Sequence, residues 1–132
     1  MQKYAYPFYV ILNREESMQY QIQENCLIIY LPKDVDHCSV QVIQHEADTI
    51  IKQNHIKHVI FDFKETQFMD SSGIGAVMGR YKLINMLGGE VWGVHINPRI
   101  KKILEMSGMH RIMQLYGEEV DNEYNQRNEV NI

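Results

Sequence analysis

The feature that most constrains the fold is an alternation of short β-type runs with longer stretches of helical periodicity. Two β-type runs come first, at residues 18–22 and 26–31, and three helix-length stretches then alternate with three further β-type runs. The predicted order is β-β-α-β-α-β-α-β. Because helical crossovers join parallel neighbours of one sheet, this order predicts an α/β domain with a mixed β-sheet backed by helices.

The first two strands are predicted from their side-chain patterns. Met18, Tyr20 and Ile22 alternate with two glutamines, which predicts a half-buried strand. Residues 26–31 form a continuous apolar run, which predicts a strand buried on both faces. Glu24-Asn25 suits a turn between the two, so we expect a hairpin.

Three helices are predicted from apolar spacing and from capping residues. Asp36 or Ser39 suits the N-cap of the first helix, and Asp70 precedes the second, which Gly88-Gly89 ends. Asn97-Pro98 starts the third, with asparagine as N-cap and proline at the first helical position. The spacing predicts inner faces made of Val40, Ile43, Ala47, Ile50 and Ile51 in the first helix, and of Ile74, Val77, Met78, Tyr81 and Ile84 in the second.

The domain is predicted to cover residues 17–124, between two terminal segments. Residues 1–16 hold the aromatic run YAYPFYVIL, which we expect to form an edge strand or an arm, because Pro7 cannot donate to a ladder. An additional short C-terminal helix is expected at residues 120–124. Residues 125–132 are expected to be a tail.

Composition and charge exclude several classes of protein. The 132 residues are 45% hydrophobic and 23% charged, which is typical of a globular domain. The formal net charge is −4 and no basic run occurs, so direct nucleic-acid binding has no electrostatic support. No apolar run approaches the roughly 20 residues that a membrane span needs. Two cysteines make no disulfide framework, and we expect a cytoplasmic protein.

The stretch FMDSSG at residues 68–73 is the candidate functional site. It places Asp70, Ser71 and Ser72 where a strand passes to a helix, and Asp36 lies on a second loop of the same kind. In α/β sheets, loops at the carboxyl ends of the strands commonly carry function. From the residues alone, the serines are helix-capping residues, a catalytic nucleophile or a phosphorylation site.

Catalysis and metal binding have less support from the sequence. The nucleophile pattern Gly-x-Ser-x-Gly is absent and no histidine is placed as a base by a recognisable motif, so we expect no enzyme. The histidines, including His55 and His58, show no ligand spacing typical of a metal site. We therefore expect neither a metal nor a cofactor.

The sequence FMDSSGIGAVMGRYKLINMLGGEVWGV, followed by NPRIKKILEMSGMHRIMQLY, resembles the STAS family. Within that family it is most similar to the bacterial anti-sigma factor antagonists, which include the sporulation regulator of sigma-F. The stretch ENCLIIYLPKDVDHCSV resembles the second strand and the loop that follows it. The resemblance covers residues 17–117 and implies a STAS fold.

The resemblance also implies a mechanism of partner switching. The unphosphorylated antagonist binds an anti-sigma factor, which is also a serine kinase, and thereby frees a sigma factor. The kinase phosphorylates the serine after the motif aspartate, which is Ser71 here, and a metal-dependent serine phosphatase removes the phosphate. The implied partner-binding residues are Asp36, Asp70, Ser72, Ile74, Gly75 and Arg80. Two alternatives stay open, a STAS regulator such as a stressosome-type scaffold and a sensor of a nucleotide or small ligand.

Overall fold

The protein is an α/β domain, described here for residues 17–118 of a computed structural model. Its main sheet has the strand order β1-β2-β4-β6-β7, in which β1 is antiparallel to β2 and the other neighbours are parallel. The strands are β1 (Gln19–Gln23), β2 (Cys26–Tyr30), β4 (His58–Asp62), β6 (Val91–Ile96) and β7 (Gln114–Gly117). The predicted mixed sheet and element order are confirmed.

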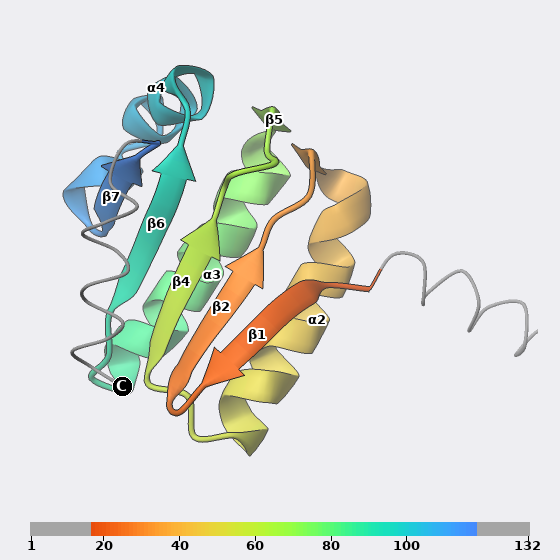
Figure 1. Cartoon of the computed structure of the whole chain (residues 1–132), viewed down its shortest axis with the longest axis vertical. Helices are drawn as coiled ribbons and strands as arrows, with labels where there is room; N and C mark the ends of the chain where they lie inside the picture. Colours follow the sequence, from red (N-terminus) through yellow and green to blue (C-terminus); the bar gives the residue numbers. More distant parts are fainter. Residues whose placement is uncertain (1–16, 119–132) are drawn as a thin grey trace, which may run out of the picture.

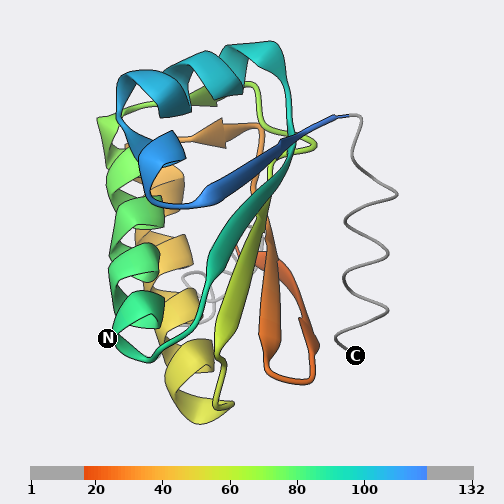
Figure 2. The same cartoon turned by 90° about the vertical axis from the view of Figure 1, so that its left-hand side faces the viewer.

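Two long helices cover one face of this sheet. Figures 1 and 2 show α2 (His37–Gln53) and α3 (Ser71–Met86) side by side behind the strands, while α4 (Pro98–Met106) lies across the end at which β4 and β6 finish. A short 3-10 helix, η1 (Met109–Arg111), leads from α4 to β7. The large apolar core lies between the sheet and the helices, and its fully buried members include Phe61, Ile84 and Leu104.

A second, smaller cluster lies on the opposite face of the sheet. Ile28, Ile60 and Val94 are buried there, with Cys26 and Trp92 packed against them. Cys26 is partly buried, and desolvation raises the pKa of its thiol to about 11. The thiol of Cys26 is therefore protonated at neutral pH.

The predicted hairpin is confirmed, and the predicted burial of its first strand is confirmed for Met18 but wrong for Tyr20 and Ile22. Glu24 turns the chain with a positive φ of 55°. Tyr20 and Ile22 remain 46% and 37% exposed. They face the helical layer, since they pair with Ile29 and Leu27. However, among residues 17–118, β1 is the edge strand of the sheet and has a strand neighbour on one side only.

The helix predictions are confirmed for α2 and α4 and corrected for α3. The five residues predicted for the inner face of α2 are the ones buried, and Asn97 caps α4 with Pro98 at its first turn. In α3 the buried residues are Gly73, Ala76, Val77, Arg80 and Ile84. Ile74, Met78 and Tyr81 are only half-buried against the core. The predictions for residues 1–16, 120–124 and 125–132 concern segments outside the described residues.

Candidate functional site

The loops that follow β2 and β4 meet in a small second sheet, which we call the platform. It consists of β3 (Asp34–Val35) and β5 (Phe68–Met69), paired in parallel. The Phe68 N–H donates to the Lys33 carbonyl at 3.1 Å, and the Asp70 N–H donates to the Val35 carbonyl at 3.3 Å. Because α2 begins just after β3 and α3 just after β5, the platform brings the two helix N-termini together.

A buried threonine fastens the platform to the rest of the fold. The Thr66 hydroxyl donates to the Pro32 carbonyl at 2.9 Å, and the Thr66 carbonyl accepts from Asn97 Nδ2 at 2.9 Å. Thr66 has no exposed surface. Asn97 also caps α4 through its side-chain oxygen, which accepts from the Ile100 N–H. Thr66 therefore joins, by hydrogen bonds, the three loops that follow β2, β4 and β6.

The N-terminus of α2 is closed by its own side chains. Asp36 Oδ1 accepts from the N–H groups of Cys38 and Ser39, at 3.1 and 3.2 Å. The Ser39 hydroxyl accepts from the Asp36 N–H at 3.1 Å, which completes a reciprocal capping box. The prediction that Asp36 or Ser39 caps this helix is confirmed for Asp36, with Ser39 as its reciprocal partner.

The N-terminus of α3 is closed less completely. Asp70 is the N-cap, and its Oδ1 accepts from the Gly73 N–H at 3.0 Å. Ser71 is the first helical residue and is exposed, whereas Ser72 is half-buried. Within residues 17–118, neither serine hydroxyl and neither of their backbone N–H groups makes a hydrogen bond. The capping role that the sequence allowed for the serines belongs to Asp70.

The two glycines of the motif have different surroundings. A Cβ on Gly73 would overlap the Val35 carbonyl oxygen, so only glycine allows α3 to pack this closely against β3. Gly75 is exposed, and a Cβ there would meet no atom within 4 Å. Gly73 is therefore explained by packing inside the domain, and Gly75 is not.

The family resemblance implied that Arg80 lies on the exposed partner-binding surface at the start of α3. The structure instead buries its side chain against α2. Its side chain is 9% exposed, and its Nε lies 3.0 Å from Asp48 Oδ1 of α2. Burial lowers the pKa of Arg80, and the nearby Asp48 carboxylate opposes that shift. The arginine belongs to the helix–helix contact because it falls on the same helical face as Val77 and Ile84. It is thus no part of the exposed surface around Ser71.

One exposed residue of the site was missed by sequence reasoning. Phe68 of β5 is 48% exposed, although large aromatic side chains are usually buried. It lies two residues before Asp70, and its strand partner Asp34 is also exposed. The sequence carried no clear signal for this, because a two-residue strand is too short to show a period and only the structure shows that Met69 is its buried residue.

The exposed site therefore combines Ser71 and Gly75 of α3 with Phe68 of the platform. Asp36 and Asp70 stand beside them as half-buried helix caps. Among residues 17–118, no group of three or more His, Cys, Asp or Glu side chains could hold a metal ion. In the same range, no helix is both long and apolar enough to cross a membrane. The arrangement suits contact with another molecule through two adjacent helix starts.

Comparison with known proteins identifies the class. The STAS domain model matches residues 17–122. The solved structure of the anti-sigma factor antagonist SpoIIAA in its unphosphorylated form superposes with a TM-score of 0.67 at 24% identity, covering 84% of this chain and 96% of that one. The solved structure of the Bacillus cell fate determinant SpoIIAA in its phosphorylated form gives the same TM-score at 27% identity, covering 84% of this chain and 98% of that one. The chain belongs to the STAS domain family.

Curated relatives narrow the assignment within that family. The anti-sigma F factor antagonist of Paenibacillus polymyxa is 40% identical over 95 residues, which are 72% of this chain and 81% of the relative. The anti-sigma F factor antagonist of Lysinibacillus sphaericus is 27% identical over 95 residues, or 70% and 81%. Within the STAS family, the chain groups with the anti-sigma factor antagonists.

Proposed function

We propose that this protein binds an anti-sigma factor with serine kinase activity, and that phosphorylation of Ser71 by that kinase ends the binding. Binding of the unphosphorylated protein frees a sigma factor, and a metal-dependent phosphatase restores the binding form. The observation that carries the proposal is the exposed Ser71 hydroxyl at the start of α3, which takes no part in capping the helix.

The local geometry favours a phosphate at this position without unfolding of the helix. The backbone N–H groups of Ser71 and Ser72 have no acceptor among residues 17–118. Free N–H groups and the helix dipole stabilise a negative charge at an exposed helix start by about 0.3–1 kcal/mol. The fold is therefore expected to survive phosphorylation, so that the modification acts on the surface.

In a close interface, the same phosphate is costly. It adds about −1.5 to −2 charges at neutral pH and three acceptor oxygens that must be desolvated. A partner carboxylate at about 4 Å would be repelled by roughly 4 kcal/mol per unit charge at an effective dielectric constant of about 20. A loss of about 3–4 kcal/mol lowers affinity by two to three powers of ten, which is enough to exchange partners.

The partner surface in this proposal is centred on Ser71 and Gly75, with Phe68 as an aromatic contact. Gly75 has open space around it, so its lack of a side chain fits close approach by a partner backbone. Asp36, Asp70, Ser72 and Ile74 stand around this centre. Arg80 contributes indirectly, because its ion pair with Asp48 joins α2 to α3 and thereby helps to fix the two helix starts.

Intact-mass measurement tests the proposal. We expect the full chain to gain one phosphate when it is incubated with Mg-ATP and the candidate anti-sigma kinase of the same organism. Ser71→Ala should abolish the gain, and Ser72→Ala, the matched control one residue away, should keep it. Loss of the phosphate only in Ser72→Ala would show that Ser72 is the phosphorylated residue, which would contradict the assignment to Ser71. No gain at all, with a kinase active on another substrate, would favour a scaffold or a ligand sensor.

The protein acts in this proposal as a binding module and kinase substrate, located in the cytoplasm, and catalyses no reaction itself. The support for a binding role is the site itself, in which neither serine hydroxyl contacts a general base among residues 17–118. An activated serine nucleophile needs such a base within hydrogen-bond reach.

A further inference from the structure

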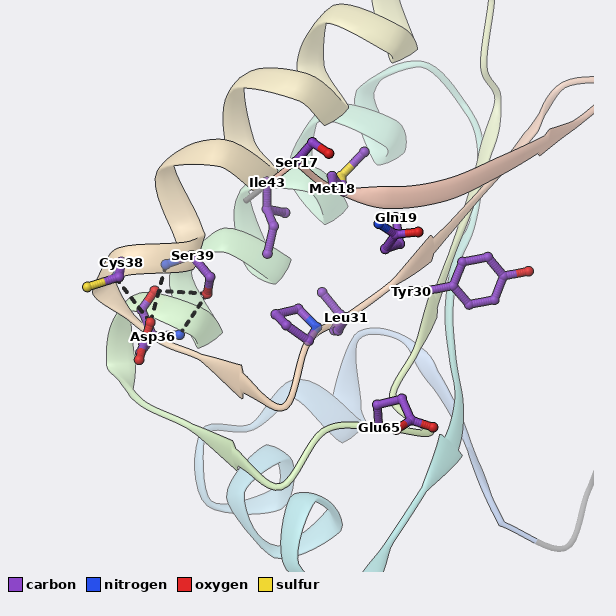
Figure 3. Close-up of a pocket in the computed structure, with 11 residues that line it drawn as sticks. Ser17, Met18, Gln19, Tyr30, Leu31, Asp36, Cys38, Ser39, Ile43 and Glu65 are labelled. Atoms are coloured by element: carbon purple, nitrogen blue, oxygen red, sulfur yellow. Dashed lines mark hydrogen bonds between the residues drawn. The ribbon is translucent and has the colours of Figure 1, made fainter. Parts of the chain in front are cut away.

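A cavity at the start of α2 is a feature that the proposed function does not explain, although Asp36 borders both the cavity and the proposed partner surface. It has a volume of about 480 Å³ and opens between the first residues of β1, the end of β2 and the first turns of α2. In Figure 3, Met18, Leu31 and Ile43 line its apolar interior, while Asp36 and Glu65 lie toward opposite sides of it. Volumes of about 300–1,000 Å³ with mostly apolar walls are typical of cavities that bind a ligand or a side chain.

The first described residue, Ser17, is one of the residues that line this cavity. The Met18 N–H donates to Glu46 Oε1 of α2 at 3.3 Å. The hydrogen bond holds the chain against α2 at this point. Residues 1–16 are therefore tethered at the cavity itself, whatever path they take from it.

The tethered residues have the composition that an apolar cavity accepts. Residues 4–12 read YAYPFYVIL, with four aromatic side chains in the first six. Only Asn13–Glu16 separate this run from Ser17, and four extended residues reach about 13–14 Å. A short tether gives an effective concentration in the millimolar range, so even weak contacts suffice for occupancy. Burying one aromatic side chain removes about 150–250 Å² of surface from water.

We propose that the aromatic run at residues 4–12 docks intramolecularly, placing an aromatic side chain in the cavity lined by Met18, Leu31 and Ile43. The seated segment would lie beside Asp36, next to the platform. The inference does not depend on the proposed function, and its test needs no partner protein.

Photocrosslinking in the full chain tests the docking. Phe8→p-benzoylphenylalanine places the probe in the middle of the aromatic run, and the irradiated chain is digested and mapped by mass spectrometry at low micromolar concentration. We expect crosslinks within one chain to Met18, Leu31 or Ile43. The same probe at Met86, which is 83% exposed at the far end of α3, should give none to these residues.

Controls separate the named occupant from its alternatives. Free peptide of residues 1–12, added above the millimolar effective concentration of the tethered run, should lower the yield from the Phe8 probe at least threefold. Crosslinks between chains that rise with concentration would assign the cavity to a second copy and overturn the proposal. Crosslinks from the Phe8 probe that miss the cavity wall would also overturn it. Circular dichroism identical to that of the unsubstituted chain shows that the probe leaves the fold intact.

Discussion

The two helix N-termini at the platform have the same N-cap residue, but their remaining capping hydrogen bonds differ. Both have aspartate at the N-cap, Asp36 in α2 and Asp70 in α3. The third helical residue is Ser39 in α2 and Gly73 in α3, and only Ser39 has a side chain that can bond back to the cap. Because a Cβ on Gly73 would overlap the Val35 carbonyl, α3 cannot have a capping box. Close packing thus leaves the start of α3 with a single side-chain capping bond, whereas the start of α2 has a complete capping box.

Gly73→Ala should have the largest effect, because it removes the packing that distinguishes the two helix starts. A methyl group at this position meets a backbone oxygen that cannot rotate away, so we expect a loss of about 3 kcal/mol in the free energy of unfolding. Urea unfolding measures it, with Gly75→Ala as the matched control. Equal stability of the two variants would show that the packing against β3 is not as close as described.

Ser71→Asp should weaken partner binding by about tenfold to a hundredfold, since it adds one charge but less bulk than a phosphate. His37→Asp is the comparison, because His37 occupies the equivalent first position of α2 and is also exposed. We expect less than a fivefold change for it. Titration calorimetry with the candidate anti-sigma factor measures both affinities. Similar losses for the two variants would show that the interface is centred midway between the two helix starts and not on Ser71.

Removing the two caps compares them directly. Asp36→Ala loses two hydrogen bonds to backbone N–H groups and should cost about 1.5–2 kcal/mol, whereas Asp70→Ala loses one and should cost about 1 kcal/mol. Thermal and urea unfolding measure both. A larger cost for Asp70→Ala would show that the N-terminus of α3 is the better stabilised of the two.

Gly75→Ala should have the smallest effect on stability, and in the opposite direction. Alanine is the better helix former and has open space here, so we expect a gain of about 0.5–1 kcal/mol. Gly79→Ala, in equally open space one turn further along, should gain about the same. Only Gly75→Ala should weaken partner binding. Equal affinities for the two variants would contradict close approach of a partner at Gly75.

The sequence predicted the parts of this comparison that depend on periodicity and capping. The inner face of α2 follows a regular spacing of apolar residues, and an aspartate before a helix is a strong N-cap signal. The resemblance of the MDSSG stretch to a known family then pointed to Ser71 as a phosphorylation site, which stays a prediction. These features are local in sequence, so they could be read without knowing the tertiary structure.

The platform was missed because it depends on contacts between distant segments. Strands β3 and β5 have two residues each, too few to show a period, and they exist only because residues 33 and 68 meet. Arg80 was assigned to the exposed partner-binding surface through the family resemblance. Yet Gly73, Val77, Arg80 and Ile84 follow spacings of four, three and four, which is one helical face. This spacing indicates a buried position for Arg80, but the prediction did not use it.

Because the strands that carry the site are parallel, the candidate site lies at one end of the domain and the turns that follow α2 and α3 lie at the other. The site lies where β2 and β4 finish, whereas the turns at residues 54–55 and 87–88 lie at the opposite end of the helices (Figure 1). Gly88 is exposed there, with a positive φ of 81° and open space around it. A biotin tag attached at this turn would immobilise the protein on a sensor surface with Ser71 facing the solution. Partner association could then be followed on an oriented layer, with Thr66 and the platform undisturbed.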